Sequence, residues 1–335
     1  MKTTNGIHTF SLKVRSSYSE IQNIITANAC IRLRKEDWGM DNRYCIPSYK
    51  GIGVEILLYQ SVSCPCWITL IVNPSSLLAG KYQPISLYQP TPKGLRKLHK
   101  ELRGVLDKLG IERRLKGFKL SRCDLTQDLY CESVGERMLR LEYFRKSLPM
   151  RSYQPVPFGK YEENEEKWRG ANAHSWTIAN KSCAFSVYDK TYELKARHAM
   201  KIKDSILRME LRLERKAIKK RTAGNAWEEQ LLELYEKQQG LTRKFLHGLH
   251  QDYDALVKRE EALARIEQSG YRKQTKRELR RIVKRADGCK SLAAVQKGSR
   301  IKKSVFIKML KRFSQMGFSP LVLPDRCGQK RLDWI

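Results

Sequence analysis

Three short segments alternate apolar and polar residues with the two-residue period of a β-strand that buries one face. They cover residues 121–129, 184–190 and 206–214. Their polar positions hold carboxylates, cations, hydroxyls and one tyrosine, namely Arg122, Asp124, Thr126, Asp128, Ser186, Tyr188, Lys190, Arg208, Glu210, Arg212 and Glu214. In the third segment the apolar residues alternate strictly, whereas a helix would scatter them around its axis. If the three strands share a sheet, these polar side chains gather on one face.

This collection of side chains suits phosphodiester chemistry. Carboxylate oxygens bind Mg²⁺ or Mn²⁺, which can polarise a phosphate and neutralise developing charge. A tyrosine hydroxyl can attack phosphorus and form a covalent phosphotyrosine, and lysine or arginine can hold the phosphate. The pattern alone leaves a second interpretation open, because exposed sheet faces often carry Arg and Glu as cross-strand pairs with no further role.

The same segments resemble, in order and approximate spacing, three motifs of rolling-circle replication initiators. Residues 121–129, SRCDLTQDL, are similar to the R-I-D-x-T/A-x-D strand of that family, residues 185–195, FSVYDKTYELK, to its Y-x-K-x-x-E segment, and residues 207–212, LRMELR, to its R-x-E-x-R strand. The likeness covers roughly residues 115–220 and includes both initiators of small Gram-positive-type plasmids and nicking endonucleases of filamentous phages. Cys123 stands where the family has an aliphatic residue, and the chain has no His-hydrophobic-His motif, so a carboxylate-based metal site is the consistent choice.

The resemblance implies a metal-dependent enzyme that nicks and religates one DNA strand at an origin. Tyr188 would be the nucleophile and form a 5′-phosphotyrosine, leaving a free 3′-OH, while Lys190 would contact the scissile phosphate. Tyr192 is the alternative nucleophile, because it shares the face of Tyr188 if the strand continues. The implied metal is Mg²⁺ or Mn²⁺. The implied metal ligands are Asp124 and Glu210, with Asp128 as a further candidate, and the candidate phosphate-holding arginines are Arg122, Arg208 and Arg212.

Two other functions stay open on the sequence. A mobilisation relaxase or transposase would use the same nicking step for a different purpose, in a plasmid, a phage or an integrated element. A regulator that only binds DNA or RNA would need none of this chemistry.

The charge of the chain indicates a polyanionic partner. The 335 residues include 66 Lys and Arg against 35 Asp and Glu, a net charge of +31. A field of this size attracts nucleic acid. An anionic membrane is less favoured, because no basic amphipathic helix with an apolar aromatic face stands out. We expect DNA as the partner, as a single-stranded or cruciform origin, with a homodimer left open.

Other sequence features bear on the cellular compartment and on the need for ATP. The sequence has no apolar run of about 18 residues and no apolar leader at its start, so we expect a cytoplasmic protein with no membrane partner. Its nine cysteines lack metal or redox spacing and fit free, partly buried thiols. No G-x-x-x-x-G-K-[ST] loop is present. We therefore expect no ATP hydrolysis, a separate host helicase, and a polymerase that extends the 3′-OH.

The elements that must position the polar side chains follow from periodicity. Strands are predicted at 7–15, 53–60, 66–73, 118–130, 174–180, 183–190 and 206–214, helices at 18–27, 92–109 and 135–148, and a loop at 149–172. We expect an α+β fold in which an antiparallel sheet carries helices on one face, related to the ferredoxin-like architecture or to a diverged HUH-type palm. The catalytic nicking domain would span residues 1–222.

A basic helical module is predicted over residues 223–335. A helix, a turn near Gly298 and a second helix are predicted over residues 291–316. Lys302, Lys303 and Lys308 would lie on the second helix above an apolar face and contact DNA phosphates or the major groove. The alternative is a solvated basic face on an ordinary helical cap.

Overall fold

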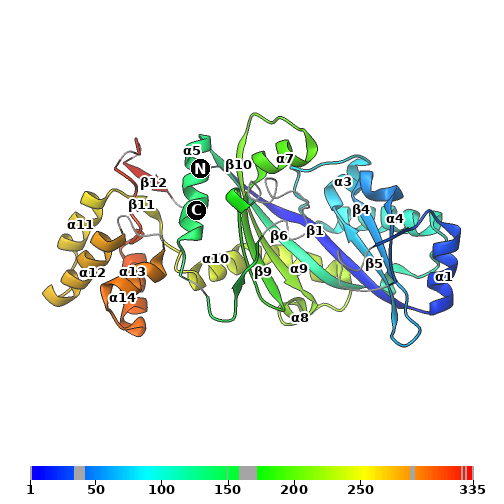
Figure 1. Cartoon of the computed structure of the whole chain (residues 1–335). Helices are drawn as coiled ribbons and strands as arrows, with labels where there is room; N and C mark the ends of the chain where they lie inside the picture. The colour runs from blue at the N-terminus through cyan, green and yellow to red at the C-terminus, as the bar shows by residue number, and fades with distance from the viewer. Residues whose placement is uncertain are drawn as a thin grey trace.

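The computed structural model describes residues 2–33, 42–148, 150–157, 172–286, 291–325, 327–328 and 330–333 (Figure 1). One ten-stranded sheet forms its centre, in the order β2-β3-β4-β5-β1-β6-β10-β9-β8-β7. Every neighbouring pair in this sheet is antiparallel. The strands are β1 (Lys2–Ser16), β2 (Ile31–Arg32), β3 (Arg43–Ile46), β4 (Val54–Tyr59), β5 (Cys66–Val72), β6 (Lys119–Cys131), β7 (Gln154–Pro155), β8 (Ser175–Ala179), β9 (Cys183–Asp189) and β10 (Ser205–Glu214). The three strands predicted to carry the polar face, β6, β10 and β9, are adjacent.

Helices cover the apolar face of these three strands. Phe185 of β9 packs against Phe144, with ring centroids 6.2 Å apart, and against Phe245, at 4.7 Å. Trp227 stacks on Phe10 of β1 at 5.8 Å. The helices that supply these and neighbouring contacts are α5 (Val134–Arg145), α8 (Arg215–Lys219), α9 (Trp227–Glu236) and α10 (Gln238–Gly248). Burying such large aromatic groups is the main stabilising contribution to this layer.

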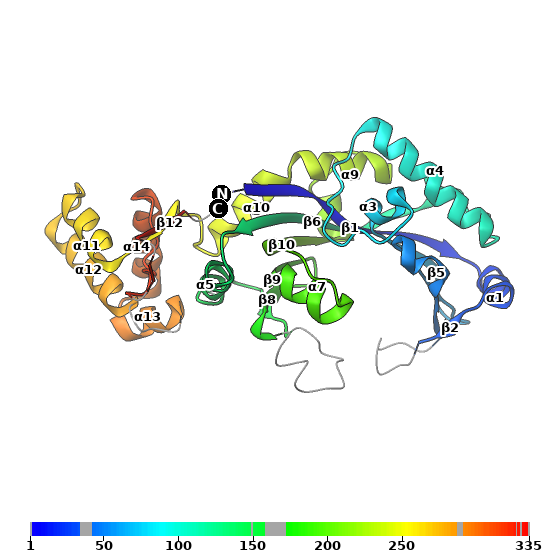
Figure 2. The ribbon, with the colours of Figure 1, turned by 90° about the horizontal axis from the view of Figure 1, so that it is seen from above.

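The N-terminal half of the sheet is covered in the same way. Leu98 and Leu102 on the inner face of α4 (Pro92–Lys108) are fully buried, and so is Ile21 on the inner face of α1 (Tyr18–Ala27). Thr91 caps α4, and Pro92 occupies its first turn, where the missing N–H costs nothing. The ring of His99 on α4 stacks with Trp227 of α9, so the two helices belong to one layer (Figure 2). Short helical turns complete this half at η1 (Pro47–Ile52), α3 (Pro74–Ala79) and η2 (Leu115–Gly117).

A segment without regular structure crosses the other face of the sheet. Residues 80–91 join α3 to α4, and Tyr88 exchanges two backbone hydrogen bonds with Ile7 of β1, at 2.8 and 3.0 Å. A Cβ at Gly6 would lie 2.8 Å from Leu87 Cβ, so this close approach requires glycine. Helix α7 (Lys190–His198) lies on the same side as this segment (Figure 2).

The remaining helices form a group at one end of the molecule, beyond α5 and α10 (Figure 1). They are α11 (Arg259–Gln268), α12 (Lys273–Ala286), α13 (Leu292–Ser299) and α14 (Lys303–Gln315), with the short strands β11 (Ala255–Val257) and β12 (Arg331–Asp333). The turn between α13 and α14 passes through Arg300 in the left-handed conformation. The predicted helix, turn and helix are therefore confirmed, and so is the α+β class with a helical C-terminal region.

The structure departs from several predicted elements. The strand predicted at 183–190 ends at Asp189, the helix predicted at 135–148 ends at Arg145, and the predicted loop at 149–172 contains the short strand β7, although most of this loop lies outside the described residues. Helices α9 and α10 lie beyond residue 222 yet share the core of the sheet, while the division into two domains stays a prediction. Among the described residues, no helix is both long enough and apolar enough to cross a membrane.

Candidate active site

The polar face of β6, β10 and β9 follows from the register of the three strands. Arg212 lies opposite Asp124 across the β10–β6 pair, Glu210 opposite Thr126, and Arg208 opposite Asp128. Across the β10–β9 pair, Arg208 lies opposite Tyr188. The strict alternation read from the sequence therefore places these side chains on one face, as predicted.

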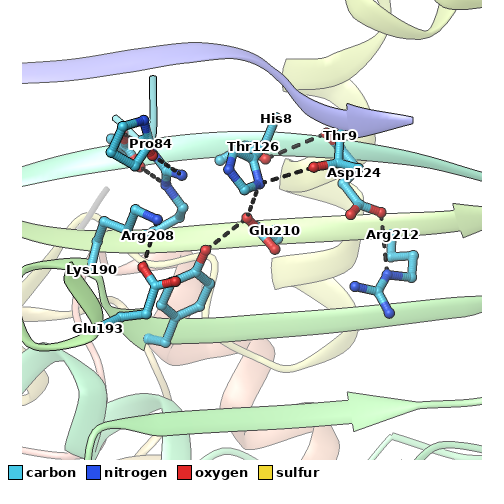
Figure 3. Close-up of polar contacts among 12 residues, drawn as sticks. His8, Thr9, Pro84, Asp124, Thr126, Lys190, Glu193, Arg208, Glu210 and Arg212 are labelled. Atoms are coloured by element: carbon cyan, nitrogen blue, oxygen red, sulfur yellow. Dashed lines mark hydrogen bonds and ion pairs between the residues drawn. The ribbon is translucent and has the colours of Figure 1, made fainter. Parts of the chain in front are cut away.

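Tyr188, Glu210 and His8 meet on this face, and Figure 3 shows Glu210 beside His8. The Tyr188 hydroxyl donates a hydrogen bond to Glu210 Oε1 at 2.8 Å. His8 Nδ1 lies 3.2 Å from the same carboxylate oxygen. The Glu210 side chain keeps 12% of its surface exposed, so a ligand can still reach it. One carboxylate thus joins a tyrosine from β9 to an imidazole from β1.

The local charges keep the tyrosine protonated and the glutamate ionised. Burial, and then the negative charge of Glu210, raise the pKa of Tyr188 well above its ordinary value. Burial alone would also raise the pKa of Glu210, but the hydrogen bond and charge of His8, followed by the charge of Arg208, hold it well below its usual range. At neutral pH the pair is a neutral phenol beside a carboxylate, an acceptor for the proton that the phenol would lose on attack.

Sequence reasoning missed His8 because a β-bulge changes the alternation of β1. Strict alternation from Phe10 would place His8 on the apolar face with Phe10 and Leu12. The pairing of β1 with β6 shifts between Ile7 and Thr9, so Ile7 and Phe10 are both fully buried although they are three residues apart. An odd spacing between buried residues in a strand is the sequence signal for such a bulge, and it would have pointed to His8.

Asp124 lies on the predicted face but is held by two arginines. Arg122 donates to it through Nε at 2.9 Å and also through Nη2, and Arg212 Nε lies 3.2 Å from the same carboxylate. The Asp124 side chain is 1% exposed, whereas those of Arg122 and Arg212 are 25% and 40% exposed. The two arginines therefore keep solvent-accessible surface, and Asp124 orients them.

Asp128 and Arg208 occupy a different place from the one predicted. Arg208 donates to both Asp128 oxygens, at 2.6 and 2.8 Å, and to the carbonyls of Pro84 at 3.2 Å and Ile85 at 2.9 Å. Both charged side chains are fully buried beneath residues 80–91. Arg208 and Asp128 thus form an internal ion pair that fastens the crossing segment to the sheet, while their predicted roles as a DNA contact and a metal ligand stay predictions.

Lys190 begins α7 instead of ending a strand, yet its ammonium stays at the site. Asp189 caps the helix by accepting from the backbone N–H of Tyr192 at 2.7 Å. Lys190 Nζ donates to Glu193 at 2.6 Å and is almost fully buried. Burial, and then the neighbouring Arg208, lower the pKa of Lys190, while Glu193 opposes them. Glu193 therefore holds the Lys190 ammonium in the interior, and its contact with a phosphate stays a prediction.

The helix start separates Tyr192 from Tyr188. Because the strand ends at Asp189, the condition that would put the two tyrosines on one strand face is not met. The Tyr192 ring stacks on His174, with centroids 3.7 Å apart and planes at 5°. It lines a hollow with Arg137 and Asp189, on the side of the sheet where α5 packs. As placed, Tyr188 contacts the glutamate and Tyr192 belongs to a separate pocket.

Among the described residues, the polar face has too few converging side chains to hold a divalent ion by itself. Within the residues that the structure describes, no three His, Cys, Asp or Glu side chains converge to hold a metal. His8 Nδ1, 3.2 Å from Glu210 Oε1, is a hydrogen-bond partner of that carboxylate and does not add a second ligand. Mg²⁺ commonly binds one or two carboxylates together with substrate phosphates and water. The described side chains therefore supply Glu210 as one oxygen ligand, and an ion bound there would need its other ligands from a substrate or water.

The C-terminal lysines lie where the sequence placed them. Lys302, Lys303 and Lys308 are exposed at the start and on the outer face of α14, whose inner face buries Phe306 and Phe313. This region is separate from the polar sheet face, and its role in binding duplex DNA stays a prediction.

Comparison with known proteins adds little to this geometry. No family model matches the chain, and no curated protein matches it. Among solved structures, the rolling circle replication initiator protein from Geobacillus stearothermophilus aligns with a TM-score of 0.38 and 8% identity, over 74% of this chain and 86% of that chain. A TM-score this low does not establish a common fold, so the function has to be argued from the side chains of the polar face.

Proposed function

We propose that this protein initiates rolling-circle DNA replication by nicking one strand with Tyr188 and later rejoining it. The observation that carries the proposal is the contact between the Tyr188 hydroxyl and the ionised Glu210, on a face that also presents Arg122, Arg212 and Lys190. A nucleophile, a proton acceptor and phosphate-holding cations are the groups that phosphoryl transfer to a side chain requires.

The reaction is a transesterification. Tyr188 Oη attacks the phosphorus, an O–P bond forms, and the bond between phosphorus and the 3′ oxygen breaks. The phenolic proton passes to Glu210 Oε1, its hydrogen-bond acceptor, as the forming O–P bond makes the phenol strongly acidic. The leaving 3′ oxygen takes a proton from water and becomes a primer end for a polymerase, and Glu210 returns its proton to the solvent. The same steps in reverse rejoin the strand.

The surrounding residues position the attack. Glu210 orients the phenol through its hydrogen bond, and His8 fixes the glutamate from the other side. Arg122 and Arg212 would bind the oxygens of an incoming phosphate, and Lys190 would neutralise charge as it develops. A Mg²⁺ or Mn²⁺ ion held by Glu210 and the DNA would supply further charge neutralisation.

An end-labelling experiment tests the nicking step. Single-stranded oligonucleotides of random sequence are labelled at either end, incubated with the protein and MnCl₂, and run on a denaturing gel. A 5′-phosphotyrosine makes the 3′ label migrate with the protein and releases the 5′ label. Tyr188→Phe should abolish the adduct, and Tyr192→Phe should keep it.

The alternatives predict other outcomes. A regulator that only binds nucleic acid gives no adduct with either label. A relaxase or transposase gives the same adduct, but does not support replication of a plasmid that carries the DNA flanking its gene. An adduct lost in Tyr192→Phe and kept in Tyr188→Phe would reject the assignment of the nucleophile.

A further inference from the structure

The polar face continues past the candidate active site into the N-terminal half of the sheet. Ser11 of β1 lies opposite Arg122 of β6, and Lys13 follows two residues later on the same side of β1. Lys13 in turn lies opposite Lys119 of β6 and Thr69 of β5. The face that holds Tyr188 and Glu210 is therefore continuous with the one that holds Lys13.

A row of two aromatic residues between two arginines crosses this part of the sheet. Arg15 lies opposite Trp67, Trp67 opposite Tyr59, and Tyr59 opposite Arg43, on the successive strands β1, β5, β4 and β3. Residues directly opposite in an antiparallel pair have neighbouring side chains on one face. The four residues thus form a continuous strip of cation, ring, ring and cation.

Part of the strip lines a hollow, and its side chains are at least partly exposed to solvent. Lys13, Arg43, Tyr59 and Trp67 line a cavity of about 150 Å³, with the buried Leu57 among its other lining residues. Lys13 Nζ lies 4.4 Å from the centre of the Trp67 ring, which confirms that the two share a face. Arg15 is exposed, and Trp67, Tyr59 and Arg43 are half-buried. The helices α1 and α4 bury the opposite face, so the strip has one open side.

We infer that this strip binds single-stranded DNA, with bases stacked on Trp67 and Tyr59 and phosphates held by Arg15, Arg43 and Lys13. Unpaired bases expose their ring faces to aromatic side chains, whereas a duplex presents mainly phosphates and groove edges. Burial, and then the nearby Arg43, lower the pKa of Lys13, a repulsion that a phosphate between the two cations would relieve. The net charge of +31 favours this anionic ligand over an acidic or apolar peptide.

The place of the strip in the sheet gives it a use in nicking, and this part of the inference rests on the proposed function. Strand β5 lies three strand spacings from β10, which is roughly 14 Å across the sheet. Along the strands the separation is larger, because Trp67 lies opposite Arg15 of β1 whereas Tyr188 shares a row with Arg208, Asp128 and Thr4, roughly 35 Å away. A strand stacked on Trp67 would continue over β1 and β6, past Arg122, to the phosphate that Tyr188 attacks. A single strand of several nucleotides would span this distance, so the strip would hold the DNA on the same face as the nucleophile and direct it towards Tyr188.

Binding is measured in a Tyr188→Phe background, where no cleavage can occur. Fluorescence anisotropy with a labelled oligothymidylate of about 16 nucleotides gives the affinity. Trp67→Ala and Tyr59→Ala should each weaken binding by about 5- to 150-fold, while Trp67→Phe should retain most of it. Arg43→Gln and Arg15→Gln should each lower the salt slope by about 0.7. Lys97→Gln, an exposed cation on α4, is the matched control and should leave both values unchanged.

Tryptophan fluorescence keeps the test valid if an alanine variant unfolds. Adding the oligothymidylate should quench the wild-type signal, and Trp67→Phe, which keeps a ring at the site, should lose most of that quenching. The inference would be overturned if the folded alanine variants bind single-stranded DNA as tightly as the parent, or if Trp67→Phe is quenched as strongly as the wild type. It would also be overturned if the alanine variants lose as much affinity for duplex DNA as for single-stranded DNA. A strip that passes these tests in a protein that forms no adduct would leave binding established and nicking rejected. If the protein forms the adduct but its affinity for single-stranded DNA is unchanged by the Trp67 and Tyr59 substitutions, nicking is established and the binding strip is rejected.

Discussion

The Tyr188 hydroxyl and the Glu210 carboxylate lie 2.8 Å apart on neighbouring strands, and the carboxylate is held from the opposite side by His8. The contact is diagonal across the β9–β10 pair, because Glu210 lies opposite Ser186 and Tyr188 lies opposite Arg208. The phenol therefore contacts a carboxylate, while the arginine opposite it is engaged by Asp128 and by the carbonyls of Pro84 and Ile85. This relationship assigns the tyrosine its partner and makes the glutamate the residue most worth changing.

Replacing Glu210 should slow nicking without removing the nucleophile. Glu210→Gln keeps a hydrogen-bond acceptor for Tyr188 but cannot take its proton or offer a charged oxygen to a metal. We expect the single-turnover rate of adduct formation to fall by about 10²- to 10⁴-fold. Glu214→Gln, on the same strand and face, is the matched control. Equal rates in the two variants would remove Glu210 from the mechanism.

The same two glutamates should affect stability with opposite dependence on pH. The pKa of Glu210 is lowered in the folded protein, so its stabilising contribution is present above the unfolded-state value of about 4.3 and is lost as the pH falls towards the folded-state value. Burial raises the pKa of Glu214, against the opposing charges of Arg122 and Arg212, so its contribution grows as the pH falls. Urea unfolding at pH 7 and near pH 3.5 measures both. The loss caused by Glu210→Gln should shrink at the lower pH, and a loss that grew there would contradict the lowered pKa.

The buried pair of Arg208 and Asp128 should matter for folding. Removing one partner by Arg208→Met or Asp128→Leu leaves an uncompensated charge and should cost about 3–5 kcal/mol of unfolding free energy. The double variant should be less destabilised than the sum of the two single changes. Arg103→Met offers a control, because Arg103 and Asp107 form an exposed pair on α4 that contributes only about 0.3–0.5 kcal/mol. Similar losses from the exposed and buried pairs would show that the crossing segment is not fastened in this way.

The lysines of α14 should contribute to binding duplex DNA. Truncation near residue 225 is a poor test, because it would remove Trp227 and Phe245 from the core of the sheet. Neutralising Lys302, Lys303 and Lys308 together to Gln leaves the buried face of α14 intact. If all three contact phosphates, the slope of log affinity against log salt should fall by about 2.7, or about 0.9 for each. The same changes at Lys93, Lys97 and Lys100 on α4 provide the control, and an equal slope in both triple variants would favour a solvated helical cap.

The sequence predicts which side chains share the polar face, but not that residues 80–91 lie over part of it. Alternation in β6, β9 and β10 predicts which side chains share a face, because that pattern is local to each strand. The segment 80–91, which buries Arg208 and Asp128, has no periodicity that could predict where it crosses the sheet. The sequence therefore predicted that Arg208 and Asp128 lie on the polar face, but not that residues 80–91 bury them as an ion pair.

The end of β9 at Asp189 and the bulge at His8 could both have been predicted from the local sequence. Asp189 followed by Glu193 is a typical helix start, with a capping carboxylate and an acidic first turn, and it predicts the end of β9. The spacing of Ile7 and Phe10 indicates the bulge that turns His8 towards Glu210. Reading these two signals would have separated Tyr192 from Tyr188 and added His8 to the site.

Peptide mapping of the covalent adduct tests the central claim most directly. Trypsin should cut after Lys181, Lys190 and Lys195, so residues 182–190 carry Tyr188 and residues 191–195 carry Tyr192 on separate peptides. After nuclease trimming of the adduct, mass spectrometry should find the nucleotide on peptide 182–190, at Tyr188. A nucleotide on peptide 191–195, or on any peptide outside the polar sheet face, would contradict the account.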